Sequence, residues 1–286
     1  MNRQTYLILG ANGQLGKQFA KELSAREERV LAPDEKKCDI TDFDSLARYI
    51  DEVTPTVVIN CAAYNAVDLA EQQSDIAMHI NGRAVENIAK LSKRNGIFLV
   101  HYSTDYVFDG KKGDLYTETD SPNPMNAYGR SKLAGEEAVQ KYAGDFLLFR
   151  TSWVFGNGTQ NFIHKLMQWA EKSSEVKLSS DEVSVPTGTA DLASLTLSAH
   201  KKGLTGLFHC VNSGFASRYD WGVHVAGILG LKASILPVPM STFPSAVVRP
   251  AFTAMSNDRL QKQLRISIPD WKSAVVRFFE EYPIGR

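Results

Sequence analysis

Short apolar runs alternate with longer segments of helical periodicity along the first half of the chain. The run TYLIL at residues 5–9 has no polar face, which is typical of a strand buried on both sides of a parallel sheet. The next segment, residues 15–23, places Leu15, Phe19 and Leu23 on one helical face. Helices between successive strands predict an α/β fold, with a Rossmann-type doubly wound parallel sheet. The same alternation predicts strands at residues 29–32, 56–60, 97–103 and 146–151, and helices at 42–53, 74–94 and 127–142.

The pattern becomes less regular after residue 152, where the elements shorten and prolines separate them. We expect residues 1–152 to form a dinucleotide-binding domain and residues 153–286 to form mainly a smaller, interleaved substrate-binding cap. Part of residues 176–212 is expected to return to the Rossmann sheet. Ligands of such sheets bind at the carboxyl ends of the strands, so we expect the site at that edge.

Composition narrows the choice of partners and compartment. Lys plus Arg and Asp plus Glu both total 32, and this balance disfavours nucleic acid or an acidic membrane as the main partner. No apolar run approaches the roughly 18 residues that suggest a membrane span, and the first residues lack a signal-peptide pattern. Cys38, Cys61 and Cys210 form no CxxC pair and are interpreted as reduced thiols, which fits a cytoplasmic protein. A monomer or a homodimer is expected. The six histidines form no metal-binding cluster, so no metal is predicted.

The first motif is GANGQLG at residues 10–16, between the first strand and the first helix. Gly10 permits a tight turn, Gly13 allows backbone to approach a pyrophosphate, and Gly16 allows the helix to pack closely on the sheet. The free amides of the helix N-terminus would then face the phosphates. A purely structural turn is the alternative, and the strand–turn–helix context favours cofactor binding.

The second motif pairs Tyr128 with Lys132, four residues apart on one helix face. A phenol with a pKa near 10 needs a stabilised anion to act as an acid, and a nearby ammonium supplies that. A tyrosine and a lysine on a solvated face are the alternative. Thr104 ends a predicted strand and can donate a hydrogen bond to a reacting carbonyl, or it can simply satisfy a turn.

Several longer motifs, taken together, resemble the extended short-chain dehydrogenase/reductases that act on nucleotide sugars. The similarity is greatest to the members that complete the synthesis of dTDP-L-rhamnose, a component of cell-wall polysaccharide. It covers essentially the whole chain. The matching segments are GANGQLG (10–16), CDITD (38–42), NCAAYNAVDLAE (60–71), STDYVFDG (103–110), NAYGRSKLAGE (126–136), RTSWVFG (150–156), VNSG (211–214), RPAF (249–252) and SND (256–258).

The resemblance implies an oxidoreductase that uses NADP(H), with NAD(H) possible, to reduce the C4 ketone of dTDP-4-dehydro-L-rhamnose. It implies that Tyr128 gives a proton to the C4 oxygen, that Lys132 lowers the pKa of Tyr128 and holds the nicotinamide ribose, and that Thr104 orients the ketone. Further cofactor contacts are implied for Gly10, Asn12, Gly13, Gln14, Leu15, Gly16, Asp39, Ile40, Cys61, Ala62, Ala63 and Tyr64, and substrate contacts for Val67, Thr104, Asp105, Tyr128, Trp153 and Arg249.

Some positions depart from the family pattern. Asn65 replaces a usual threonine, Arg218 a common aromatic residue, and Asp181-Glu182 the usual Asp-Gln. These changes bear on the shape of the sugar pocket. Some relatives dimerise around magnesium through glutamates, and no such set is recognised in this chain. Lys36 and Lys37 follow the second predicted strand, where a 2′-phosphate would lie, and they favour NADPH.

Other functions remain open. An epimerase or dehydratase acting on sugar nucleotides would share the fold, and so would a dinucleotide-binding regulatory subunit such as the partner of methionine adenosyltransferase. The presence of Thr104, Tyr128 and Lys132 together favours an enzyme. Dehydratases carry Asp-Glu directly after the catalytic threonine, whereas here Asp105 is followed by Tyr106.

Overall fold

A six-stranded parallel sheet forms the centre of the computed structural model, which describes residues 4–245 and 247–283. Its strand order, β10-β5-β4-β3-β1-β2, reverses at β1, which lies between β3 and β2. Burial of β1, β3 and β5 on both faces explains their nearly continuous apolar sequences. The strands are β1 (Thr5–Leu9), β2 (Arg29–Leu31), β3 (Val57–Asn60), β4 (Phe98–Thr104), β5 (Phe146–Thr151) and β10 (Gly206–His209).

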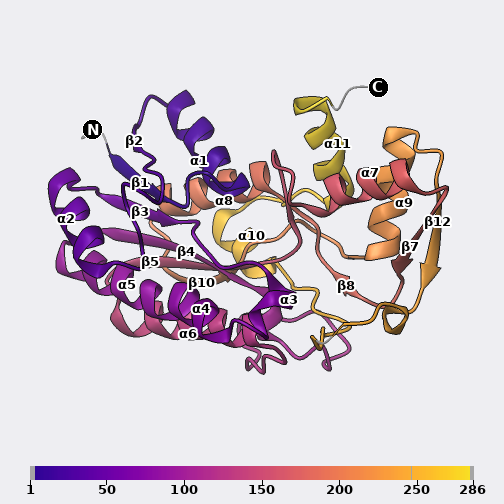
Figure 1. Cartoon of the computed structure of the whole chain (residues 1–286). Coiled ribbons are helices and arrows are strands. Elements are labelled where there is room, and N and C mark those ends of the chain that lie inside the picture. The colour runs from indigo at the N-terminus through magenta and orange to yellow at the C-terminus, as the bar shows by residue number, and fades with distance from the viewer. Residues whose placement is uncertain (1–3, 246, 284–286) are drawn as a thin grey trace.

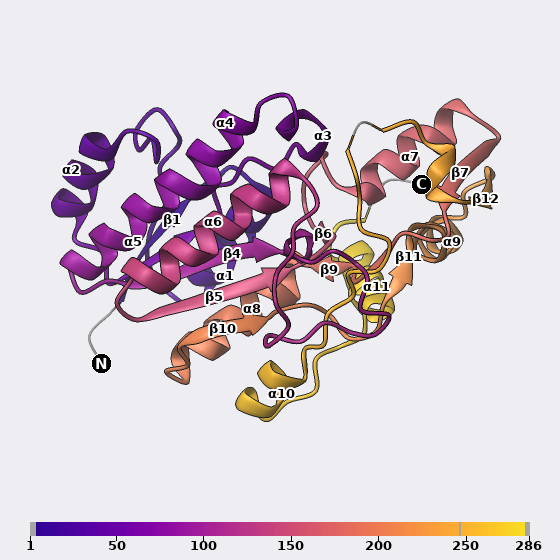
Figure 2. The same cartoon turned by 90° about the horizontal axis from the view of Figure 1, so that it is seen from below.

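Helices cover both faces of this sheet, and the expected doubly wound α/β fold is confirmed (Figures 1 and 2). One layer holds α1 (Gln14–Ala25) and α8 (Thr189–Lys201), whose apolar side chains pack with β1 and β5. The opposite layer holds α2 (Phe43–Val53), α5 (Ala84–Arg94) and α6 (Ala127–Tyr142).

The segment 74–94 is less regular than the single helix that its periodicity predicts. It contains α4 (Ser74–Met78), a π-helical turn η1 (His79–Arg83) and then α5. Within the turn, the buried Asn81 side chain accepts a hydrogen bond from Tyr64 N at 2.9 Å and donates to Ser131 Oγ at 3.0 Å. The π-turn thus aims a polar side chain at partners that lie far away in the sequence.

The second half of the chain forms smaller elements beside the carboxyl edge of the sheet (Figure 1). Residues of β10 pair with β5, so this half also contributes the outer strand of the central sheet. The remaining strands form two-stranded sheets, which are β6 (Val154–Phe155) with β9 (Thr187–Gly188), β7 (Glu175–Ser179) with β12 (Ser234–Val238), and β8 (Val183–Ser184) with β11 (Ala216–Ser217).

One further short α-helix, α3 (Val67–Ala70), lies in the first half of the chain. The other α-helices lie in the second half and are α7 (Phe162–Lys172), α9 (Arg218–Leu229), α10 (Asp258–Leu264) and α11 (Trp271–Glu281).

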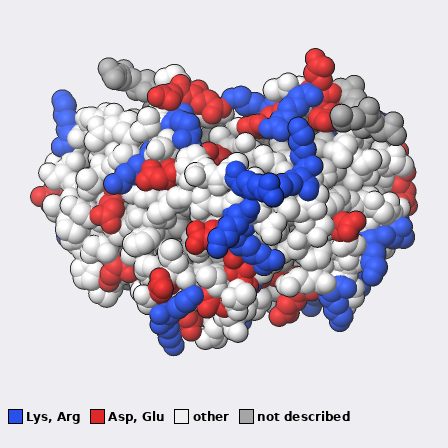
Figure 3. Space-filling view, turned by 180° about the vertical axis from the view of Figure 1, so that it is seen from behind, with Lys and Arg blue, Asp and Glu red and all other residues white. Residues whose placement is uncertain are grey.

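The surface carries both signs of charge. Figure 3 shows Lys and Arg interspersed with Asp and Glu on one face, in keeping with the formal net charge of zero. Among residues 4–245 and 247–283, no helix is both long enough and apolar enough to cross a membrane.

Candidate active site

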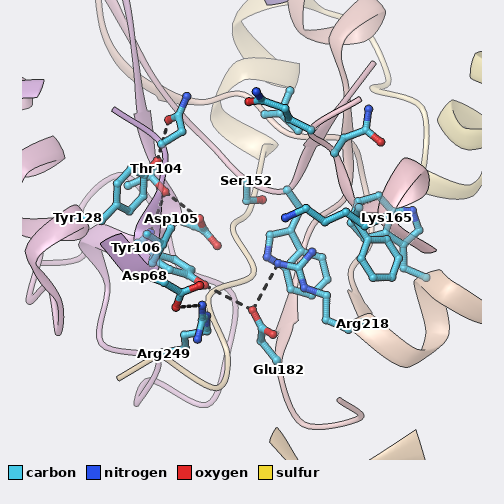
Figure 4. A pocket seen from close by; sticks show the side chains of 18 of the residues that line it. Asp68, Thr104, Asp105, Tyr106, Tyr128, Ser152, Lys165, Glu182, Arg218 and Arg249 are labelled. Atoms are coloured by element: carbon cyan, nitrogen blue, oxygen red, sulfur yellow. Dashed lines mark hydrogen bonds and ion pairs between the residues drawn. The ribbon is translucent and has the colours of Figure 1, made fainter. Parts of the chain in front are cut away.

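A cavity of about 2130 Å³ opens between the carboxyl edge of the sheet and the second half of the chain. Thr104, at the end of β4, and Tyr128, on α6, lie on one side of it. Lys165 and Arg218, from α7 and α9, lie on the other side (Figure 4). Its walls therefore come from both halves, as expected for a site at the carboxyl ends of parallel strands.

The glycine turn has no room for side chains at two positions. A Cβ atom on Gly10, whose φ is +74°, would lie 2.6 Å from Ala62 N, and one on Gly16 would lie 2.4 Å from Gly10 O. Gly13 directly precedes α1 and faces more open space, since its nearest contact would be at 3.4 Å. This close-packed turn at a helix N-terminus, lining a large cavity, fits the phosphates of a dinucleotide.

Tyr128 and Lys132 are both buried at the start of α6, where the Asn126 side chain caps the helix by accepting a hydrogen bond from Gly129 N at 2.8 Å. Lys132 Nζ donates to Tyr102 O at 2.6 Å, and burial lowers the pKa of Lys132 to about 8 against the opposing effect of the Glu136 carboxylate. Burial raises the pKa of Tyr128 to about 12, although a hydrogen bond with Thr104 acts in the lowering direction. The effect of Lys132 on the Tyr128 phenol remains a prediction.

Thr104 and Asp105 form a buried hydrogen-bonded pair beside Tyr128. Thr104 Oγ1 donates to Asp105 Oδ1 at 3.0 Å and accepts from Tyr106 N at 3.2 Å. Burial raises the pKa of Asp105, and its hydroxyl donors act in the opposite direction. The Tyr128 hydroxyl also lies 3.5 Å from Asn65 Oδ1, so the departure at position 65 contacts the proposed acid.

The far side of the cavity is built around Trp153. The Arg218 guanidinium lies 3.6 Å from the ring centroid of Trp153 and 3.4 Å from Glu182, whose carboxylate also accepts from Tyr106 Oη at 3.4 Å. Because a guanidinium stacks well on an indole, Arg218 covers part of the Trp153 ring, for which the resemblance implies contact with the substrate. The two departures at positions 182 and 218 are thus partners in one ion pair.

Arg249 also lines the cavity, where it is ion-paired with Asp68 and donates to Ser245 Oγ at 2.8 Å. Among the part of the chain that the structure describes, no group of three or more His, Cys, Asp or Glu side chains is placed to hold a metal ion.

The structure brings most of the predicted site residues to the cavity. Four expected cofactor residues lie outside its lining. Gly10 lies against the backbone of Ala62, and Asp39 accepts a hydrogen bond from Thr41 N at 2.8 Å. Ile40 is buried, and Tyr64 N donates to Asn81 Oδ1. The lining includes Asn12, Gly13, Gln14, Leu15, Gly16, Cys61, Ala62, Ala63, Val67, Thr104, Asp105, Tyr128, Lys132, Trp153 and Arg249.

Sequence reasoning missed two buried hydroxyl groups, Ser184 and Thr253, that contact Asp105. It also missed Lys165, which points into the cleft in Figure 4. None of the three lies within a recognised motif, although Thr253 directly follows RPAF (249–252).

The doubly wound sheet, the glycine turn and the Tyr128–Lys132 pair define a short-chain dehydrogenase/reductase. The model of the family described as RmlD substrate binding domain matches residues 4–284, and the chain belongs to this family. The expected membership in the nucleotide-sugar branch of the dehydrogenases is thereby confirmed.

Individual relatives agree over nearly the full length. The dTDP-4-dehydrorhamnose reductase of Burkholderia thailandensis is 40% identical, covering 94% of this chain and 96% of that protein. The Escherichia coli enzyme of the same name is 34% identical, covering 96% and 97%. The crystal structure of dTDP-4-dehydrorhamnose reductase from Bacillus anthracis in complex with NADP is 34% identical, covers 98% of this chain and 99% of that chain, and has a TM-score of 0.94.

Proposed function

We propose that this protein reduces the C4 ketone of dTDP-4-dehydro-L-rhamnose to dTDP-L-rhamnose with NADPH, and that NADH can replace NADPH. The relatives named dTDP-4-dehydrorhamnose reductase and the NADP complex of the Bacillus anthracis enzyme support this assignment. The observation that carries it is the placement of Tyr128 and Thr104 in a cavity shared with the glycine turn. A purely regulatory dinucleotide-binding subunit would not need that proton donor at the cavity wall.

The cofactor supplies the hydride, and the protein supplies orientation and a proton. Residues 10–16 would hold the pyrophosphate and Lys132 the ribose. Tyr128 then transfers its phenolic proton to the C4 oxygen as that oxygen gains negative charge. One hydride on carbon and one proton on oxygen convert the ketone to the alcohol. Thr104 orients the ketone beside the phenol.

We assign the substrate to the part of the cavity next to Thr104 and Tyr128, with contacts from Val67 and Asp105 on one side and from Trp153 and Arg249 of the second half of the chain. Arg249 would meet the diphosphate, because a guanidinium fork matches two phosphate oxygens, and it would then exchange its pairing with Asp68. In this scheme residues 1–152 bind the dinucleotide, and residues 153–286 mainly bind the sugar nucleotide. Such an enzyme acts on soluble metabolites, so we place it in the cytoplasm as a monomer or homodimer.

To test the proposal, the protein is incubated with NADPH and each of a panel of nucleotide sugars. The loss of NADPH is followed by its absorbance, and the sugar products are identified. We expect one NADPH consumed per dTDP-4-dehydro-L-rhamnose converted, and no keto product from dTDP-glucose. Dehydration of dTDP-glucose would instead identify a dehydratase, and conversion without loss of NADPH would identify an epimerase. Binding of NADPH without any turnover would favour a regulatory subunit.

A further inference from the structure

Three hydroxyl groups from distant parts of the chain converge on the Asp105 carboxylate. Thr104 Oγ1 donates to Oδ1 at 3.0 Å, while Ser184 Oγ and Thr253 Oγ1 donate to Oδ2 at 2.7 and 2.5 Å. All four side chains are buried, with at most 6% of each residue exposed. A carboxylate in such a site depends on these donors, because burial of an unpaired charge is costly.

The second half of the chain presents Ser184 and Thr253 together. Val183 N donates to Ala251 O at 2.7 Å, and Thr253 N donates to Val183 O at 2.9 Å, so the two segments run side by side next to Asp105. The cluster therefore joins the substrate half of the cavity directly to the residue that follows Thr104.

Thr104 has one hydroxyl proton and two neighbours that can accept it. In the structure the proton goes to Asp105, yet the Tyr128 phenol oxygen is also within its reach. A hydroxyl can donate only once at a time. When Tyr128 gives up its proton, the resulting phenolate becomes a stronger acceptor for a hydrogen bond from Thr104.

We propose that Ser184 and Thr253 are positioning residues that keep the Asp105 carboxylate hydrogen-bonded, which frees the Thr104 hydroxyl proton from Asp105, so that it can orient the ketone and then turn toward the Tyr128 oxygen once the phenol has given up its proton. The inference rests on the proposed function. In the proton transfer the Tyr128 O–H bond breaks and an O–H bond forms on the C4 oxygen, while C4 gains the hydride supplied by the cofactor and its C=O bond becomes a C–O single bond. Thr104 keeps its proton and exchanges one acceptor for another.

Loss of both donors should leave Asp105 dependent on Thr104. The hydroxyl groups of Ser184 and Thr253 lower the pKa of Asp105, and so does the positive charge of Arg218. Removal of the two hydroxyl groups should therefore raise the pKa of Asp105 further above its usual range. The other ionisable groups facing the cluster are Tyr106, Tyr128 and the Glu182 carboxylate that bonds Tyr106. At a pH above this raised pKa, the charged carboxylate keeps the hydrogen bond from Thr104. At a pH below it, the carboxyl group is protonated and no longer needs that hydrogen bond.

The test uses the full-length double variant Ser184→Ala/Thr253→Val. We expect kcat to fall by about tenfold at pH 8, with KM for NADPH unchanged within about twofold, as for loss of a buried hydrogen-bond network. The deficit should shrink as the pH is lowered. Thr253→Ser should retain activity, and Ser92→Ala, which removes a buried hydroxyl without a hydrogen-bond partner, should have no effect.

A second readout does not need turnover. Carboxyl ¹³C NMR, with the Asp105 signal assigned from Asp105→Asn, should show a higher titration midpoint in the double variant than in the wild type. An unchanged midpoint, an unchanged kcat, or an equal loss of kcat at every pH would overturn the inference. If the double variant does not fold, Ser184→Ala alone should show the same trends, with kcat lower by about threefold. Failure of the wild type to reduce the 4-keto sugar would instead refute the proposed function.

Discussion

The two walls of the cavity are held in shape by different means. On the cofactor side, backbone approaches backbone, and Gly10 and Gly16 leave no space for a Cβ atom. In the part of the cavity that we propose for the substrate, here called the substrate wall, paired side chains define the lining, with Arg218 against Glu182 and Arg249 against Asp68. The comparison indicates that the cofactor wall tolerates little change, while the substrate wall can be adjusted by exchanging charged partners.

Replacement of Tyr128 should have the largest effect on activity. Tyr128→Phe keeps the ring and removes the proton donor, so we expect kcat to fall by about two to four orders of magnitude. The dissociation constant for NADPH should stay within about threefold of the wild type. Steady-state kinetics and cofactor titration would check this, and a variant that keeps more than about a tenth of the activity would show that another group donates the proton.

The cofactor wall can be tested with one added methyl group. Gly16→Ala would force an atom to within 2.4 Å of Gly10 O, so we expect weaker NADPH binding and a free energy of unfolding lower by about 1–3 kcal/mol. Gly227→Ala is the matched control, because no atom lies within 4 Å of the added Cβ in α9. Denaturant melts and cofactor titration would compare them. If Gly16→Ala and Gly227→Ala showed equal NADPH binding and equal free energies of unfolding, close backbone packing would not be what defines the cofactor wall.

The substrate wall should respond more gently. Arg218→Met removes the charge over Trp153, and we expect KM for the sugar nucleotide to change by about three- to tenfold while NADPH binding is unchanged. Glu182→Gln and the double variant complete a double-mutant cycle. Additive effects on KM would show that the pair does not act as a unit in shaping the pocket.

The smallest effect should come from outside the cavity lining. Replacing Lys36 and Lys37 with alanine should raise KM for NADPH by about two- to fivefold and spare NADH, since only NADPH carries the 2′-phosphate. Both lysines are exposed, and Lys37 lies 5.6 Å from the ring centroid of Tyr49. Equal changes for both cofactors would show that these lysines do not contact the 2′-phosphate.

The sequence predicted the strand, glycine turn and helix beside the cavity because their determinants are local. A strand, a glycine turn and a helix are contiguous in residues 5–25, and Tyr128 and Lys132 are one helical turn apart. Periodicity alone places such elements, and parallel strands bring their carboxyl ends to one edge.

Features that depend on distant partners were not predictable in this way. The π-turn at Asn81 depends on Tyr64 and Ser131, and the Asp105 cluster depends on Ser184 and Thr253. The pairing of Glu182 with Arg218 joins two positions noticed separately as departures, and only the fold shows that they are in contact.

The central claim is that the cavity brings a nicotinamide hydride to C4 of the sugar while Tyr128 supplies the proton. Incubation of dTDP-4-dehydro-L-rhamnose with NADPH deuterated at the transferable position, followed by NMR of the sugar, tests it most directly. We predict one deuterium at C4 of dTDP-L-rhamnose for each NADPH oxidised, and in Tyr128→Phe the same labelled product formed about two to four orders of magnitude more slowly. A product without deuterium at C4, or one formed without net oxidation of NADPH, would contradict the claim.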